Sequence, residues 1–296
     1  MCTGFGRYLL YERSLSRNTA SAYLRDVEHL AAWVQQNSPG LPPQGVDADM
    51  LRKMVAEGHF AGFEASSQAR FLSGIRAFYR YLALEKQVVE NPVDLLDRPT
   101  VRRKLPEVLS VAEIEAMLKA IDRSKPEGAR NLAIIEMLYG CGLRVSELTT
   151  LHISDLFFDE EFIRVIGKGN KQRWIPVGRR AIEEVQHYLT HIRVHIPVNP
   201  RNTDVLFLNR RGAPLSRVMI FSIVKELAVK AGISLKKVSP HSFRHAFATH
   251  LMEAGADIRS VQEMLGHESI TTTEIYTHLD RHYLRQTLLE FHPRNK

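Results

Sequence analysis

The stretch SPHSFRHAFATHL, residues 239–251, places two phosphate-binding groups at the start of a helix. Ser239 and Pro240 are typical of an N-cap and a first helical turn. His241 then lies where unpaired backbone N–H groups and the positive end of the helix dipole attract an anion. Arg244 follows on the same face, and its guanidinium can hold two oxygens of one phosphate. Taken alone, the stretch also fits a surface histidine beside a salt-bridging arginine.

Two further features lie downstream of this helix. In Leu265-Gly266-His267 the glycine is typical of a left-handed C-cap, which would direct His267 out of the turn. Nine residues later, Tyr276 lies in TTTEIYTHL, residues 271–279, which we interpret as a short helix. On its own, Tyr276 would be an ordinary half-buried aromatic residue.

Two basic residues upstream occupy positions from which they could reach a ligand. Arg144 lies in GLRVSEL, residues 142–148, at the first turn of a predicted helix, and Glu147 is placed one turn later to orient it. Lys168 lies in GKGNKQR, residues 167–173, at the tip of a predicted hairpin. None of these fragments decides the function alone.

The second half of the chain predicts a helical domain that carries a small sheet. Two strands, 162–166 and 173–177, are joined by a glycine-bearing turn, and a third short strand is expected at 205–208. Apolar spacing predicts helices at 110–121, 129–139, 144–151, 178–192, 216–231, 241–254, 257–265 and 271–279.

The first hundred residues predict helices only. Asn18 and Thr19 can cap a helix that ends before Pro39, and a second helix is expected from about 66 to 86. Three arginines lie on or beside the outer face of this second helix: Arg70, Arg76 and Arg80. They could form a solvated surface or contact a partner.

A linker separates the two halves. Proline spacing around residues 97–106 and the basic run Arg102-Arg103-Lys104 indicate extended chain. A capping box formed by Ser110 and Glu113 opens the next helix.

Composition narrows the class of protein. The net charge is +7; residues 1–100 hold 11 basic and 11 acidic side chains, so the excess lies in residues 101–296. This excess points weakly to a phosphate-rich partner. No run approaches the roughly 20 apolar residues of a membrane span, and the start lacks the features of a signal peptide, so we expect no membrane association and a cytoplasmic location. Two cysteines fit a reducing compartment, with Cys141 in a core.

Together these motifs resemble the tyrosine recombinases of the phage-integrase type, most closely the bacterial Xer branch that resolves chromosome dimers. The similarity extends to LSRNTASAYLRDV, residues 15–27, and covers nearly the whole chain. Ser242-Phe243 and Glu268 depart from the usual pattern without touching an active-site position. The six residues that resemble the family's active site are Arg144, Lys168, His241, Arg244, His267 and Tyr276.

The resemblance implies a mainly α fold with a small β-sheet. It implies an N-terminal helical core-binding (SAM-like) domain at 1–96, a linker at 97–106 and a mixed α/β catalytic domain at 107–296. It also implies that Tyr276 is the nucleophile in DNA strand transesterification and forms a 3′-phosphotyrosyl intermediate. No cofactor or metal is expected, because arginines take the place of metal ions.

The resemblance further implies the partners. These are a double-stranded DNA recombination site, a homo- or hetero-tetramer with a sister recombinase, and a cell-division DNA translocase. The chain itself is then expected to be associated with the nucleoid. The last helix, about 281–290, is expected to dock on a neighbouring subunit through Leu284, Leu288 and Leu289. Expected DNA contacts are Arg70, Arg76, Arg80, Arg102, Arg103, Lys104, Lys171 and Arg173.

Other functions stay open at this point. A mobile-element integrase shares the chemistry, and so does a type IB topoisomerase. A non-enzymatic DNA-binding accessory protein would have no use for the six-residue set. His241 and His245 have the spacing of a helical zinc pair, but Ser242 stands where a metallohydrolase would have its glutamate.

Overall fold

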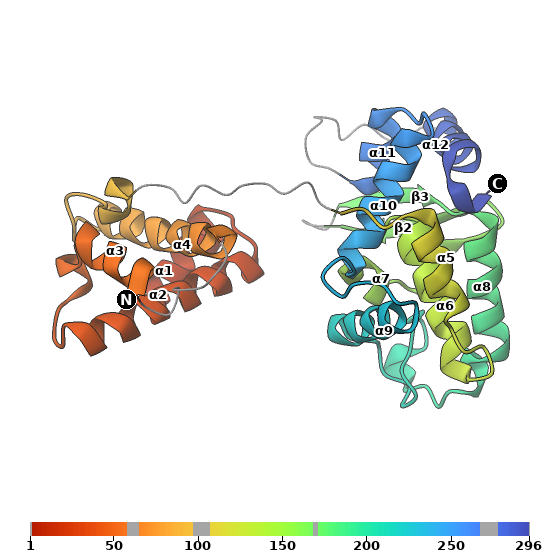
Figure 1. The fold of residues 1–296 in the computed structure, drawn as a ribbon, viewed down its shortest axis with the longest axis horizontal. Coiled ribbons are helices and arrows are strands. Elements are labelled where there is room, and N and C mark those ends of the chain that lie inside the picture. The colour runs from red at the N-terminus through yellow and green to blue at the C-terminus, as the bar shows by residue number, and fades with distance from the viewer. Residues whose placement is uncertain (1, 58–64, 97–106, 168–170, 267–277, 296) are drawn as a thin grey trace. The chain divides into compact units, whose positions relative to one another are not determined.

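The computed structural model describes residues 2–57, 65–96, 107–167, 171–266 and 278–295. The chain divides into two compact units, residues 1–105 and 106–296 (Figure 1). Each unit has its own hydrophobic core. The predicted fold class, mainly α with a small β-sheet, is confirmed. The expected linker at 97–106 lies outside the described residues.

All the regular secondary structure in the described part of the front unit is helical. Its long helices pack against each other, and aromatic and aliphatic side chains such as Phe71, Ile75 and Leu30 fill the space between them. The cap of the first long helix is Ser16, whose Oγ accepts the backbone N–H of Thr19 at 3.1 Å, rather than Asn18 or Thr19 as expected. The helices are α1 (Cys2–Arg7), α2 (Arg17–Asn37), α3 (Ala48–Glu57) and α4 (Ala65–Leu84).

The second unit carries helices around an antiparallel sheet of order β1-β2-β3. The predicted hairpin is present with the register Ile163↔Ile175, and the short β1 pairs with the outer side of β2. The strand expected at 205–208 is wrong, because only isolated bridges form there. The strands are β1 (Leu156–Phe157), β2 (Phe162–Ile166) and β3 (Gln172–Pro176). The helices are α5 (Val111–Lys119), α6 (Pro126–Gly140), α7 (Val145–Thr149), α8 (Arg179–His191), α9 (Arg217–Lys230), α10 (Pro240–Glu253), α11 (Ile258–Leu265) and α12 (His278–Phe291).

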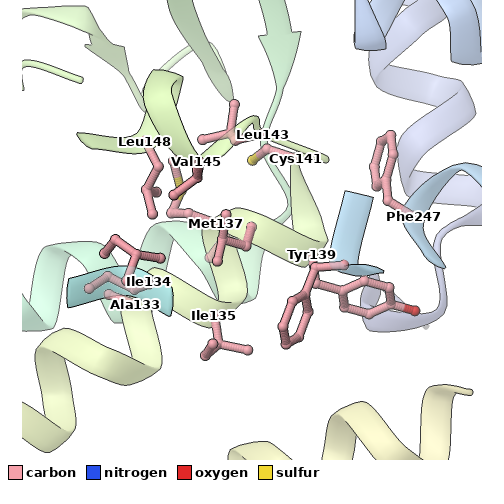
Figure 2. Packing of buried hydrophobic residues seen from close by; sticks show 14 of the residues in the cluster. Ala133, Ile134, Ile135, Met137, Tyr139, Cys141, Leu143, Val145, Leu148 and Phe247 are labelled. Atoms are coloured by element: carbon pink, nitrogen blue, oxygen red, sulfur yellow. The ribbon is translucent and has the colours of Figure 1, made fainter. Parts of the chain in front are cut away.

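Helix α6 lies at the centre of the second unit. Almost all of its side chains from Gly128 to Gly140 are buried, since α8 and α10 pack against it. Figure 2 shows its apolar side chains and those of the turn after it, with Phe247 reaching in from α10. Cys141 is fully buried in this cluster, as predicted for a core residue. The end of α6 therefore holds the following turn, which carries Arg144, in a fixed place.

The last helix packs within its own unit. Helix α12 packs against β3, α10 and α11 (Figure 1). Its Leu284 and Leu288 are each 1% exposed and belong to the core of the second unit. The Arg281 guanidinium lies 4.1 Å from the Trp174 ring centre, and Arg294, just beyond the helix, forms a partly buried ion pair with Glu136. Two of the three leucines expected to dock on a neighbouring subunit are thus already covered in the single chain, and Leu289 is half-buried.

No helix in the described part of the chain combines the length and hydropathy needed to cross a membrane.

Candidate active site

Arg144 stands at the start of α7, directly after the turn that ends α6. Gly142 adopts a left-handed conformation (φ +58°) there, where an added Cβ would collide with the Phe247 ring. The backbone N–H of Arg144 donates to Glu147 Oε2 at 2.8 Å, and Arg144 Nη1 donates to Glu147 Oε1 at 2.8 Å. The predicted role of Glu147 in orienting Arg144 therefore fits the geometry.

Glu147 holds a second arginine that comes from the sheet. Arg173 on β3 donates from Nη1 to Glu147 Oε1 at 2.8 Å and from Nη2 to Glu147 Oε2 at 2.9 Å. The side chains of Arg173 and Glu147 are only 6% and 3% exposed, whereas that of Arg144 is 33% exposed. Of the two arginines on this carboxylate, Arg144 is the one that reaches solvent.

Arg244 reaches the same place from α10. It lies one turn after the helix start, and its Nη1 donates to the carbonyl oxygen of Gly142 at 2.8 Å. Its Nη2 donates to the carbonyl oxygen of Leu265. Arg244 is 9% exposed, so backbone acceptors from two other segments fix its guanidinium.

The C-terminal turn of α11 gathers the three arginines. Consecutive carbonyl oxygens of this turn accept hydrogen bonds from different arginines: Met264 from Arg173, Leu265 from Arg244, and Gly266 from Arg144. The last carbonyls of a helix have no partner within the helix and carry partial negative charge, so they suit cations. Gly266 ends the helix in the predicted left-handed conformation, with φ +64°.

The charges of the cluster act on one another. Burial by itself would raise the pKa of Glu147, but hydrogen bonds from Arg173 and Arg144 and the charge of Arg173 outweigh it and lower the pKa. Burial, with the nearby charges of Arg144 and Arg173, lowers the pKa of Arg244 to about 10, although Glu147 opposes the shift. Glu147 and Arg244 are therefore both charged at neutral pH.

His241 lies at the first turn of α10 and is exposed. The start of this helix follows the prediction: the backbone N–H of Ser242 donates to Ser239 Oγ at 3.3 Å, and Pro240 occupies the first turn. Ser242 Oγ also donates to the Lys237 carbonyl oxygen at 2.7 Å. His241 is thus presented to solvent from a well-capped helix end.

Three of the six predicted active-site residues lie outside the described residues. They are Lys168, His267 and Tyr276. The structure does describe the points where the chain enters those segments. Gly167 and Lys171 flank the segment that contains Lys168, and the Gly167 N–H donates to the Lys171 carbonyl oxygen at 2.8 Å. Gly266 directly precedes His267.

The expected DNA contacts occupy different environments. Arg80 and Lys171 are exposed, whereas Arg70 pairs with Asp26, and Arg76 pairs with Asp94 at 2.8 Å. Arg173 does not fit an exposed contact, because its guanidinium is buried against Glu147. Arg102, Arg103 and Lys104 lie outside the described residues.

Metal-binding groups and a further reactive histidine are the other chemistry to consider within the described ranges. No group of three or more histidine, cysteine, aspartate or glutamate side chains among those residues could hold a metal ion. His250 is buried and shares a hydrogen bond of 2.8 Å with the Tyr139 hydroxyl, and burial lowers its pKa.

Sequence reasoning missed two features of the site. The first is the role of the α11 carbonyls, which no side-chain pattern reveals. The second is the burial of Arg173, for which a signal existed. Arg173 and Ile175 share one face of β3 because successive strand residues alternate, and Ile175 is fully buried.

Comparisons with known proteins give matches over nearly the whole chain. Residues 107–282 match the model of the phage integrase family, and residues 2–86 match that of the phage integrase N-terminal SAM-like domain. A curated relative from Chlorobaculum tepidum, named tyrosine recombinase XerD, is 44% identical over 98% of this chain and 95% of its own length. A relative of the same name from Staphylococcus aureus is 40% identical over 97% of each chain.

Solved structures give the same likeness. The XerH site-specific recombinase, bound to a palindromic difH substrate in a post-cleavage complex, has a TM-score of 0.69 and 26% identity. The match covers 92% of this chain and 78% of that one. The likeness to a Tn1549 transposon integrase, with a TM-score of 0.72 at 20% identity, concerns the fold alone.

Proposed function

The chain belongs to the phage integrase family, the family of the tyrosine recombinases, and we propose that it resolves chromosome dimers at a specific DNA site during cell division. The observation that carries the proposal is the convergence of Arg144 and Arg244 on the last turn of α11. This pair offers permanently charged donors for two oxygens of one phosphate. The turn that holds the pair directly precedes His267 in the chain. Curated relatives named XerD favour the chromosomal role over that of a mobile-element integrase.

The proposed reaction is transesterification at a DNA phosphodiester. Tyr276 attacks phosphorus, the 5′-oxygen leaves, and a 3′-phosphotyrosyl bond stores the energy for rejoining. A phenol has a pKa near 10, so it must lose its proton during attack, and the exposed His241 is the proposed acceptor. Lys168 is the proposed general acid that protonates the leaving 5′-oxygen.

The arginines supply the electrostatic part of the catalysis. Negative charge accumulates on the non-bridging oxygens of the phosphorus in the transition state, where fixed donors stabilise it most. Arg244 is held by two backbone carbonyls and Arg144 by Glu147, so neither guanidinium needs to reorganise greatly during the reaction. His267 is proposed as a further donor.

The proposed partners follow from this chemistry. Double-stranded DNA is the substrate, with Arg70, Arg76, Arg80, Lys171 and the run Arg102-Arg103-Lys104 as proposed phosphate contacts. We propose a tetramer on two DNA sites, with a sister recombinase or with copies of this chain, and a DNA translocase of cell division as a further partner. Exchange of α12 between subunits would require Leu284 and Leu288 to leave their own core first.

The first prediction tests the nucleophile. Tyr276→Phe removes one oxygen, so we expect covalent protein–DNA adduct to disappear while DNA binding stays near that of the wild type. The substrate is a nicked duplex carrying the site recovered by sequencing DNA trapped on the wild-type protein in cells. Denaturing gels measure the adduct, and gel shifts measure binding.

A matched control lies close by in the sequence. Tyr283→Phe removes the same atom from an exposed tyrosine of α12 and should leave adduct formation intact. Adduct formation by Tyr276→Phe would overturn the assignment. The recovered sequence also separates the two roles, because a mobile-element integrase would trap the ends of its element rather than one chromosomal site.

A further inference from the structure

Arg173 connects the parts of the site that come from different elements. Its guanidinium donates two parallel hydrogen bonds to Glu147, the carboxylate that orients Arg144. Its Nε donates to the Met264 carbonyl oxygen at 2.9 Å, in the turn that also accepts Arg144. One buried side chain of the sheet therefore contacts both supports of Arg144.

Two glycines allow Arg173 to occupy this place. A Cβ on Gly266 would lie 3.0 Å from Arg173 Cδ, and a Cβ on Gly167 would lie 3.3 Å from Arg173 Nη1. Gly167 directly precedes Lys168 and Gly266 directly precedes His267. The backbone that leads into each of these two segments thus packs against the Arg173 side chain.

The cost of burying this arginine argues for a role beyond stability. Burying an ion pair costs several kcal/mol of desolvation per ion, and apolar residues of the same volume often stabilise a core equally well or better. Arg173 also adds a positive charge beside Arg144 and Arg244, which disfavours the charged form of Arg244. A planar guanidinium can bind the Glu147 carboxylate through two donors, and a lysine cannot.

We propose that Arg173 is a positioning residue for strand cleavage, which holds Arg144 through Glu147 and the last turn of α11 in the geometry that binds the scissile phosphate. The proposal rests on the proposed function, because it assigns Arg173 a task only if Arg144 stabilises the transition state. Arg173 itself does not touch the substrate.

The test is a double-mutant cycle on single-turnover cleavage of the nicked duplex described above. Arg173→Lys keeps the charge but loses the paired hydrogen bonds, and we expect cleavage about 100-fold slower, as for a catalytic group displaced by about 1 Å. Arg144→Ala is expected to be slower still. Adding Arg173→Lys to Arg144→Ala should cost nothing further, since the group that Arg173 positions is then gone.

A second substrate gives a readout that a purely structural role would not move. A methylphosphonate at the scissile position removes one charged oxygen and therefore lowers the need for a cation. The rate defects of Arg144→Ala and Arg173→Lys should both shrink on this substrate. The matched control is Arg164→Lys on β2, whose arginine pairs with buried Asp155 in the same sheet at 2.8 Å, and we expect its rate to stay near wild type on both substrates.

The outcomes separate the two proposals. If Arg173→Lys is folded and cleaves like the wild type, or if its defect multiplies with that of Arg144→Ala, the positioning role is wrong and the proposed function stands. If Arg144→Ala cleaves normally, the proposed function fails first. Thermal unfolding of each variant monitors the fold. If Arg173→Lys does not fold, Glu147→Asp takes its place in the cycle, and the same pattern is expected.

Discussion

Each unit of the molecule buries a carboxylate against an arginine, and the two pairs behave differently. In the front unit, Asp26 accepts two hydrogen bonds of 2.8 Å from Arg70. In the second unit, residues 106–296, which is the catalytic unit, Glu147 accepts two hydrogen bonds of 2.8 and 2.9 Å from Arg173. Burial raises the pKa of Asp26 despite Arg70, whereas two arginines lower the pKa of Glu147 despite its burial.

The difference comes from the surroundings of the arginines. The Arg70 side chain is 51% exposed, so water screens its charge, and Arg70 is the one arginine that donates to Asp26 within the described part of the chain. Arg173 is 6% exposed, and Arg144 adds a second pair of hydrogen bonds to the same carboxylate. The same contact geometry thus leaves the pKa of one carboxylate above its ordinary value and that of the other below it. Only the second arrangement suits a site that must present a fixed charge.

The largest expected effect distinguishes the two pairs by stability. Glu147→Gln leaves the Arg173 charge buried without its partner, and we expect the catalytic unit to lose about 3–5 kcal/mol. Asp26→Asn leaves Arg70 in solvent, so we expect a loss of less than about 1 kcal/mol from the front unit. Urea unfolding, followed unit by unit, gives both values.

The two tryptophans of the chain make this measurement possible, because Trp33 lies in the front unit and Trp174 in the catalytic unit. Fluorescence of a Trp33→Phe background reports the catalytic unit, and a Trp174→Phe background reports the front unit. Equal losses in the two units would mean that the exposure of the arginine does not govern the strength of the pair.

A smaller effect is expected when pH is varied, and its sign differs between the units. The pKa of Glu147 lies below its unfolded value, so its contribution to stability is present above about pH 4.5 and is lost as pH falls through the folded pKa. The pKa of Asp26 is raised, so its contribution is fully present below about pH 3.8 and is lost as pH rises through the folded pKa.

The stability gap between wild type and variant should therefore change in opposite directions on acidification. For Glu147→Gln, the difference in the free energy of unfolding between wild type and variant should narrow as pH falls below 4.5. For Asp26→Asn, the same difference should change in favour of the wild type as pH falls. Unfolding curves between pH 7 and pH 3.5 in the two tryptophan backgrounds measure it. Parallel changes would show that the two carboxylates do not differ in this way.

The smallest expected difference between the two units serves to calibrate the comparison. Ser16 and Ser110 each cap a helix, one in each unit, through a side-chain oxygen that accepts a backbone N–H at 3.1 and 3.2 Å. Because the contacts are alike, Ser16→Ala and Ser110→Ala should each cost about 1 kcal/mol in their own unit. A much larger loss in one unit would show that the units differ in general sensitivity, and not only in their ion pairs.

Much of the fold follows from local sequence patterns. The capping box at Ser110, the hairpin around Lys168 and the left-handed Gly266 each depend on a few neighbouring residues. The structure has the capping box and the left-handed glycine as expected, and it has both strands of the hairpin. The cap at Ser16 was misplaced by two to three residues, because several neighbouring polar residues are good caps. The burial of α12 depends on packing within the whole unit, which its short apolar stripe does not specify.

The candidate site was predictable in its residues but not in its supports. Arg144 and Arg244 could be identified from motifs, because chemistry restricts the residue types that bind phosphate. The backbone carbonyls that hold them carry no sequence signature, since every residue has one. Arg173 was misplaced because a basic residue beside a hairpin tip more often faces solvent.

The last turn of α11 ties three arginines of the site to one helix end. Three guanidinium groups share this turn, so its fraying would not be confined to a helix end. Each carbonyl that swings away would free a positive charge close to two others, and the resulting repulsion would favour release of the rest. Glu147 and the Gly142 carbonyl oxygen hold the arginines from the other side, and a phosphate that binds between Arg144 and Arg244 would add a negative charge that favours the held arrangement.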